Sequence, residues 1–267
     1  MAIEKGNSDA MFILEFMYYF GNSVKQNSEE EIKYYKMAIE TGDSKAMYKL
    51  GYMYQNGKGV EQNYKEAIKY YKMAIEKGDN TDAMVDLGYM YQNGEGVEQN
   101  YKEAIKYYEM ASEKGDSNAM ATLGYMYCND EYGVGRNFEI GIRYYQLSIE
   151  KGNDEAMNSL GNMYQNGEGV ERNYEEAIKY YKMSIEKGNE MAEINLLELM
   201  GKINKLSTTE KIKYYNILNQ CEKTKEYAEK IIIKYKTNDI VQMYNINEKL
   251  KQEVKELRIH IESLQRK

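Results

Sequence analysis

The sequence predicts an all-α protein, an α/α superhelical solenoid of helix-turn-helix repeats with a C-terminal coiled-coil helix. Loop glycines recur every 36 or 37 residues, which indicates a tandem array. The 267 residues contain no proline, the commonest helix breaker. From residue 240 onward the apolar positions change to a heptad spacing. The recurring glycines are Gly6, Gly42, Gly78, Gly115, Gly152 and Gly188.

The first helix of each copy is amphipathic. In the second copy Ala46, Leu50, Met53 and Tyr54 fall at positions i, i+4, i+7 and i+8, which is the apolar stripe of a helix. Gly51 lies beside that stripe, where a helical glycine costs about 1 kcal/mol relative to alanine. We therefore expect a neighbouring helix backbone to approach it closely. The same glycine returns as Gly88, Gly124 and Gly161.

The second helix of each copy sets small residues against large ones. In copy two these are Ala67 and Ala74, with the bulky Ile68 and Tyr71. Their helical phase predicts that the tyrosines of the stripes are core residues rather than contact residues. The tyrosines so assigned are Tyr54, Tyr71, Tyr91, Tyr108, Tyr127 and Tyr145.

Polar residues and glycines are expected to mark the helix ends. Asn63, followed three residues later by Glu66, predicts a capping box in which the glutamate reaches back to the asparagine backbone. Gly78 is placed to end the second helix with a positive φ angle. Gly57 and Gly59 are placed to reverse the chain between the helices.

The pattern Ala-x3-Leu-Gly-x2-Tyr-x2-Gly-x-Gly-Val, followed by Asn-x3-Ala-x3-Tyr-x2-Ala, closely resembles the Sel-1-like repeat, a relative of the tetratricopeptide repeat. The resemblance spans residues 1 to about 200. It implies a curved superhelix with the first helices on its concave face, and a protein that acts as an adaptor in complexes. The near-identity of the copies and the Lys-, Asn-, Ile- and Tyr-rich composition are also similar to repeat proteins of large DNA viruses and amoeba-associated organisms.

The first and last copies depart from the pattern. Copy one has Glu15 and Glu31 where copy two has Gly51 and Ala67. Terminal repeats are expected to be atypical because they cap the array. We therefore expect a repeat array at 1–200 with degenerate first and last copies, capping helices at 201–236 and a coiled-coil helix at 237–267.

A tyrosine- and amide-lined groove follows from placing the first helices on the concave face. Such side chains give large contact area and adaptable hydrogen bonds, which suits an extended peptide. The alternative is a solvent-exposed face with no ligand. The predicted partner-binding residues are Tyr48, Tyr52, Gln55, Tyr89, Gln92, Tyr125, Asn158, Asn162 and Gln165.

The C-terminal heptads predict a parallel homodimer. Branched residues at a and leucines at d favour two strands, and Asn247 is a polar a residue of the kind that fixes register. The alternative is an amphipathic helix that folds back over the last repeat. The predicted dimer seam is Asn247, Leu250, Val254, Leu257, Ile261 and Leu264.

Charge bears on the choice of partner. Residues 1–200 carry 34 acidic and 21 basic side chains, a net charge of −13, whereas 201–267 carry +6. An acidic array argues against nucleic acid, which requires a positive surface. We therefore expect a neutral or basic protein or peptide segment as partner. The remaining alternatives are an RNA-binding helical repeat and a regulatory subunit of an enzyme complex.

Residues suited to catalysis are scarce. His260 is the single histidine, and Cys128 and Cys221 stand far apart, so that we expect no metal, no cofactor, no disulfide framework and no enzymatic activity. The apolar stretch 12–20 is too short to span a bilayer. The sequence therefore predicts a cytoplasmic protein without a membrane anchor.

Overall fold

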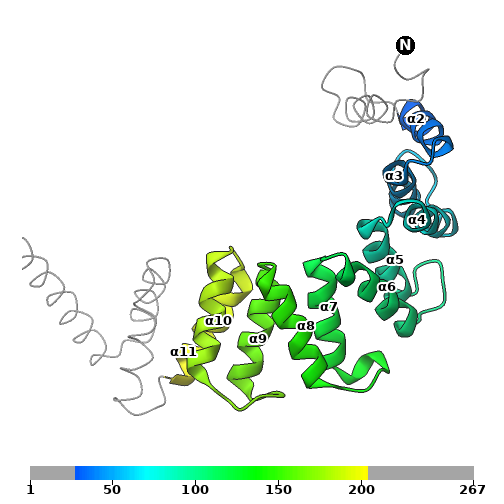
Figure 1. Cartoon of the computed structure of the whole chain (residues 1–267). Helices are drawn as coiled ribbons and strands as arrows, with labels where there is room; N and C mark the ends of the chain where they lie inside the picture. The colour runs from blue at the N-terminus through cyan, green and yellow to red at the C-terminus, as the bar shows by residue number, and fades with distance from the viewer. Residues whose placement is uncertain (1–27, 204–267) are drawn as a thin grey trace, which may run out of the picture. The chain divides into compact units, whose positions relative to one another are not determined.

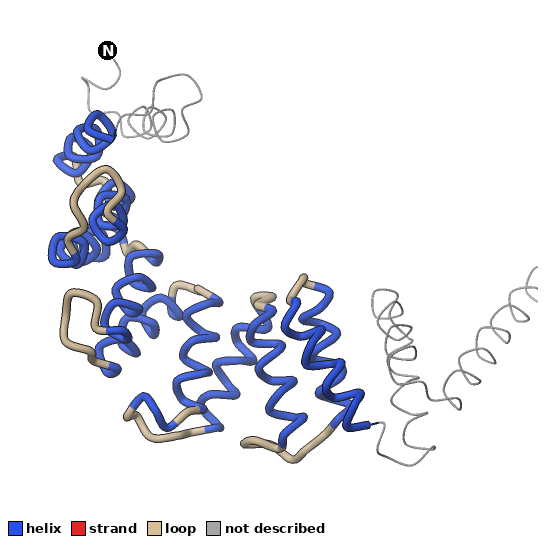
Figure 2. Tube along the Cα trace, turned by 180° about the vertical axis from the view of Figure 1, so that it is seen from behind, coloured by secondary structure: helices blue, strands red, loops and turns tan. Residues whose placement is uncertain are grey.

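The computed structural model describes residues 28–203 of the chain. Every regular element in this part of the chain is helical, and no strand occurs there (Figure 2). The all-α prediction is confirmed. Most of the predicted capping region at 201–236 and all of the predicted coiled coil at 237–267 lie outside the described residues.

Ten α-helices and one 3-10 helix make up residues 28–203. Helices α3, α5, α7, α9 and α11 are first helices of their copies, and α2, α4, α6, α8 and α10 are second helices. The bounds are α2 (Ser28–Glu40), α3 (Ser44–Asn56), α4 (Tyr64–Gly78), α5 (Thr81–Asn93), α6 (Tyr101–Glu113), α7 (Ser117–Cys128), η2 (Asp130–Tyr132), α8 (Phe138–Glu150), α9 (Asp154–Asn166), α10 (Tyr174–Glu186) and α11 (Glu190–Ile203).

The chain divides into two compact units, unit 1 at Met1–Asn153 and unit 2 at Asp154–Lys267. Helices α2 to α8 belong to unit 1, and α9 to α11 belong to unit 2. Within each unit, helices that follow one another in the chain pack against one another (Figure 1).

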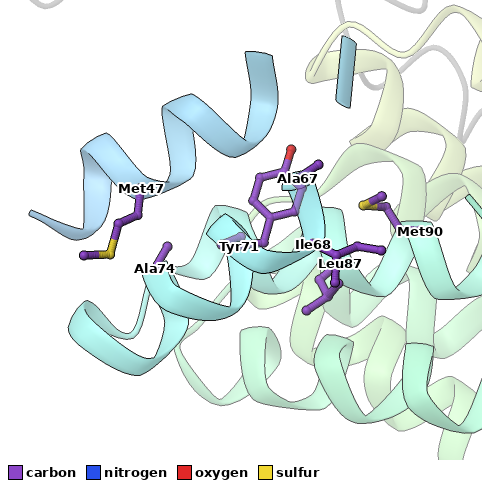
Figure 3. Close-up of a cluster of buried hydrophobic side chains, with 8 residues drawn as sticks. Met47, Ala67, Ile68, Tyr71, Ala74, Leu87 and Met90 are labelled. Carbon is purple, nitrogen blue, oxygen red and sulfur yellow. The ribbon is translucent and has the colours of Figure 1, made fainter. Parts of the chain in front are cut away.

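The core of unit 1 is built from the predicted stripes. Leu50, Leu87 and Leu123, one from each first helix, have no exposed surface. Burying one such side chain contributes roughly 1.5–3 kcal/mol. Figure 3 shows one cluster, to which three consecutive helices contribute Met47 from α3, Ala67, Ile68, Tyr71 and Ala74 from α4, and Ala83, Leu87 and Met90 from α5.

In four of the described first helices, α3, α5, α7 and α9, a glycine receives a tyrosine ring of the following helix. A Cβ atom on Gly51 would lie 2.8 Å from the ring of Tyr71, and one on Gly161 would lie 2.7 Å from the ring of Tyr181. Gly88 with Tyr108 and Gly124 with Tyr145 repeat the contact. The expectation of a close approach is confirmed, but its main partner is a ring rather than a helix backbone. Glycine is required here because any side chain would overlap the ring.

Two details of the helix ends differ from the sequence prediction. The Asn63 side chain accepts hydrogen bonds from the backbone of Lys65 and Glu66, as expected of an N-cap. The Asn63 N–H donates to the carbonyl of Tyr54 at 2.8 Å instead of to Glu66, so the reciprocal half of the capping box is absent there. The positive φ angle at the end of α4 is at Asp79 (47°) rather than at Gly78, because this helix continues through the glycine.

The predicted core tyrosines fall into two groups. Tyr71, Tyr108 and Tyr145 are buried, as expected. The tyrosines of the first helices are half-buried instead, because each stacks on a tyrosine of its second helix near the surface. These pairs are Tyr54 with Tyr70, Tyr91 with Tyr107, and Tyr127 with Tyr144.

Within residues 28–203, none of the helices combines the length and the apolar character that crossing a bilayer requires.

Candidate protein-binding face

A row of tyrosines lies on the first helices of unit 1. We call Tyr48 and Tyr52 on α3, Tyr89 on α5 and Tyr125 on α7 the tyrosine face. Tyr52, Tyr89 and Tyr125 occupy the same position of three successive copies, two residues after the buried leucine. Helical geometry turns this position away from the leucine stripe. Tyr89 and Tyr125 are each 49% exposed, so both rings are available to a ligand.

The α3 end of the tyrosine face is a stack of rings with a lysine over it. The Tyr48 ring lies 6.4 Å from that of Tyr52 and 5.7 Å from the buried Tyr71 ring, on which it stacks. The Lys58 Nζ lies 4.7 Å from the centre of the Tyr52 ring and donates a hydrogen bond to the Tyr52 hydroxyl. A cation therefore already interacts with one ring of this face.

The α7 end of the tyrosine face is extended by Tyr132, which sequence reasoning missed. Tyr132 belongs to η2, the irregular turn of copy four, and packs edge-on against Tyr125 at 5.9 Å and Tyr101 at 5.1 Å. Desolvation, together with Tyr125, raises the pKa of Tyr132 to about 12. The available signal was a tyrosine at the place where copy four replaces its glycine turn.

Each of the three predicted glutamines accepts a hydrogen bond from the hydroxyl of a buried tyrosine. The Tyr71 hydroxyl donates to Gln55 Oε1, and the Tyr108 hydroxyl donates to Gln92 Oε1 at 2.9 Å. Gln165, which is 6% exposed, accepts from the Tyr181 hydroxyl at 3.2 Å. The carbonyl of each amide is therefore engaged within its own copy. A Gln–Tyr pair repeated at a separation of 16 residues was the signal in the sequence.

The predicted asparagines of unit 2 are also engaged internally. Asn158 Oδ1 accepts from the side chain of Asn195 on α11 at 2.8 Å. Asn162 Oδ1 accepts from the Tyr181 hydroxyl at 2.7 Å. The structure therefore brings Tyr48 and Tyr52 together at the α3 end of the tyrosine face, and it places the amides in supporting hydrogen bonds.

Asp86 on α5 is a second residue that sequence reasoning missed. It lies beside the tyrosine face, where the hydroxyls of Tyr48 and Tyr71 interact with its carboxylate. Its Oδ2 atom is buried and has no hydrogen-bond partner. Desolvation raises the pKa of Asp86, and the two tyrosines only partly oppose that rise. The signal was a carboxylate at a position where the other first helices carry Lys49, Thr122, Ser159 and Asn195.

No group of three or more His, Cys, Asp or Glu side chains arranged to hold a metal ion occurs within residues 28–203. His260 and the predicted dimer seam, Asn247, Leu250, Val254, Leu257, Ile261 and Leu264, lie outside the described residues.

Comparison with known families gives one match, the Sel1 repeat. Its family model matches five consecutive segments, at residues 8–43, 44–79, 81–116, 117–153 and 154–189. No curated protein resembles the chain closely enough to count as a match.

Two solved structures share this fold over most of the chain. A Sel1 repeat protein from Oxalobacter formigenes is 32% identical, with a TM-score of 0.68, and the match covers 81% of this chain and 89% of that one. The c5321 protein, a protective antigen of uropathogenic Escherichia coli strains with an SLR fold, is 29% identical with a TM-score of 0.69. That match covers 82% of this chain, which spans only half of the length of the antigen.

Proposed function

The chain belongs to the Sel1 repeat family, and from this premise we propose that it is a non-catalytic adaptor whose tyrosine face holds a segment of another protein. Proteins of this family generally mediate protein–protein interactions and are generally non-catalytic. The observation that carries the proposal is the 49% exposure of Tyr89 and Tyr125 on neighbouring copies. Exposed tyrosines offer large contact area at low entropic cost, which suits binding of a peptide segment.

The bound segment is proposed to be neutral or basic. The net charge of −13 over residues 1–200 favours a partner of opposite sign and speeds its association. Among the amides assigned to the same groove, Gln55, Gln92, Asn162 and Gln165 accept from buried tyrosine hydroxyls and Asn158 accepts from Asn195. Their side-chain N–H groups are proposed to contribute to binding.

The test compares capture of partners by matched variants. The full-length chain, Tyr89→Ala/Tyr125→Ala and Ile140→Ala are immobilised and incubated with lysate, and the captured proteins are quantified by mass spectrometry. Ile140 is an exposed apolar residue (38%) on the second helix α8, so its variant controls for loss of exposed apolar surface. We expect partners that the wild type and Ile140→Ala retain and the double variant loses. Equal capture by all three chains would contradict the proposal.

Nucleic acid is the other outcome to be measured. An electrophoretic mobility assay with single-stranded RNA on the same chains separates the two classes, because a helical repeat that reads RNA would shift the probe. If the wild type shifts the RNA probe at physiological salt and the tyrosine variant does not, the ligand of the tyrosine face is RNA rather than a protein segment.

Homodimerisation through the C-terminal heptads and residence in the cytoplasm are further parts of the proposal. The heptad spacing from residue 240 supports the first, and two cysteines far apart in the chain are compatible with the second. Sedimentation of the full chain and of Leu250→Lys/Leu257→Lys tests the dimer. We expect a dimer that the substitutions convert to a monomer, and a monomeric wild type at micromolar concentration would contradict it.

A further inference from the structure

The residue at issue is Asp86, the only carboxylate at its position among the described first helices. Asp86 directly precedes the buried leucine of α5. The residue directly before the buried leucine of the other first helices is Lys49 on α3, Thr122 on α7, Ser159 on α9 and Asn195 on α11. A core role would repeat from copy to copy, as the leucines and glycines do. A residue that one copy alone carries, next to the tyrosine face, is better explained by a contact that only this copy makes.

The surroundings of Asp86 come from three helices. The hydroxyls of Tyr48 on α3 and Tyr71 on α4 lie near the carboxylate, and that of Tyr71 donates its proton to Gln55. The Asp86 charge also contributes, after desolvation, to the raised pKa of Tyr108 on α6. The residue as a whole retains partial exposure, whereas its Oδ2 atom is buried without a partner. Asp86 is therefore partly exposed as a residue, while one of its two carboxylate oxygens is shielded from water.

A desolvated carboxylate oxygen without a partner is costly, because a charge removed from water needs a counter-charge or a full set of hydrogen bonds. No Lys or Arg of residues 28–203 forms an ion pair with Asp86. The charged neighbour on its own helix is Asp82, which has the same sign. A positive charge beside the Asp86 carboxylate would therefore offset the cost of its desolvation.

The rings around it are suited to a cation. Tyr48 stacks on Tyr71 at 5.7 Å and lies 6.4 Å from Tyr52. Lys49 and Lys58 already lie over the rings of Tyr48 and Tyr52, at 5.8 and 4.7 Å. Aromatic faces next to a carboxylate combine the two interactions that recognise lysine and arginine side chains.

We propose that Asp86 and the partly exposed Tyr48 ring, which stacks on the buried Tyr71, form a pocket for one cationic side chain, lysine or arginine, of the protein segment that lies on the tyrosine face. This inference rests on the proposed function and deepens it, since it names the residue class that the segment must present. In the described part of unit 2, Ser159 and Asn195 stand at the position of Asp86, and Asn158, at the position of Tyr48, is bonded to Asn195.

The test uses side-chain mimics, so that it does not depend on an identified partner. n-Butylammonium represents lysine and n-propylguanidinium represents arginine, and each is titrated into the full-length chain while the thermal unfolding midpoint is recorded. A ligand of the folded state raises the midpoint by mass action. Potassium chloride at equal ionic strength controls for screening, and butyramide controls for the alkyl chain.

The variants are Asp86→Asn, Asp86→Ser and Glu98→Gln. Asp86→Ser copies the residue of α9, and Glu98→Gln removes an exposed loop carboxylate of the same unit as the matched control. We expect at least one of the two cations to raise the midpoint of wild type and of Glu98→Gln, and its apparent affinity to fall about tenfold or more in both Asp86 variants. A wild-type midpoint that neither cation moves, or equal rises in all four chains, would overturn the proposal.

Failure of this inference can be told from failure of the proposed function. If the partners captured through the tyrosine face are also captured by Asp86→Asn, the adaptor function stands and the cationic pocket is wrong. If Tyr89→Ala/Tyr125→Ala captures the same proteins as wild type, the tyrosine face itself is wrong, whatever the cations do.

Discussion

The first helices of unit 1 and unit 2 have similar buried residues but different residues on their outward-facing side. The position two residues after the buried leucine is Tyr52, Tyr89 and Tyr125 in unit 1, and Asn162 and Glu198 in unit 2. Two of these tyrosines are half-exposed, whereas Asn162 accepts a hydrogen bond from the hydroxyl of the buried Tyr181. Unit 1 therefore presents rings at this position, whereas in unit 2 the residue on α9 supports the core and the residue on α11 is an exposed carboxylate.

The difference shows which positions of a Sel1 repeat can vary. Leu87 and Leu160 have no exposed surface, and Gly88 and Gly161 both lie against a tyrosine ring. Each interior repeat packs on its neighbours through these contacts, so they recur in copies two to five. The positions that turn away from the leucine stripe carry no such constraint, and the residues there can differ from copy to copy for binding.

The largest expected effect tests the shared core. Tyr71→Ala in unit 1 and Tyr181→Ala in unit 2 each remove a fully buried ring, which typically costs about 3–5 kcal/mol of unfolding free energy. Chemical denaturation followed by circular dichroism measures the loss. Tyr125→Ala, at 49% exposure, is the control and should cost under about 1 kcal/mol. A loss in one unit only would show that the cores are not equivalent.

The next effect tests the glycine. Gly88→Ala and Gly161→Ala place a Cβ atom 2.9 and 2.7 Å from the rings of Tyr108 and Tyr181. We expect losses of about 1–3 kcal/mol from overpacking, even though alanine favours the helix by about 1 kcal/mol. Ser159→Ala on α9 is the control, since it removes only a hydroxyl. If alanine stabilises either unit, the ring contact does not explain the glycine.

A smaller effect separates the two units. Tyr108→Phe removes a hydroxyl that donates to Gln92, and Tyr181→Phe removes one whose single proton is shared between Asn162 and Gln165. Gln92 is half-buried and can bind water instead, whereas Gln165 is buried and would keep an unsatisfied carbonyl. We expect about 1 kcal/mol for Tyr108→Phe and about 2 kcal/mol for Tyr181→Phe in denaturation experiments. Equal costs would contradict the assignment of Asn162 and Gln165 to the core of unit 2.

The sequence predicts what the repeat enforces in every copy. The glycine period, the leucine stripe and the buried Tyr71 follow from spacing alone, because each unit must hide the same face. The sequence does not reveal which atoms meet at Gly51, since glycine spacing reports only that something approaches. The Gln55 amide was assigned to a ligand because its helical phase is that of the groove, and only the structure brings the Tyr71 hydroxyl to it.

Asp86 could not be interpreted from the sequence for a physical reason. A single aspartate on a helix is ordinarily solvated, and its desolvation here depends on Tyr48 and Tyr71, which come from two other helices. A comparison of the copies does single it out as an exception, but it gives no environment. Positions whose residue differs from copy to copy are therefore candidates for function, and the structure is needed to interpret them.

The smallest expected effect concerns the pH dependence of Asp86. Desolvation raises the pKa of its folded-state carboxyl above the usual value of 3.8, and the Tyr48 and Tyr71 hydroxyls and Asp82 are the groups that face it. The folded chain therefore holds this proton more tightly than the unfolded chain, and stability falls as the pH rises from the usual value through the raised one. Asp86→Asn removes that loss, so its stability relative to wild type should increase over the same pH range, by less than about 1 kcal/mol. Urea denaturation of both chains from pH 3 to pH 7, with Glu98→Gln as the control for loss of one negative charge, measures the difference. A difference between Asp86→Asn and wild type that stays constant over that range would mean that folding does not raise the pKa of Asp86.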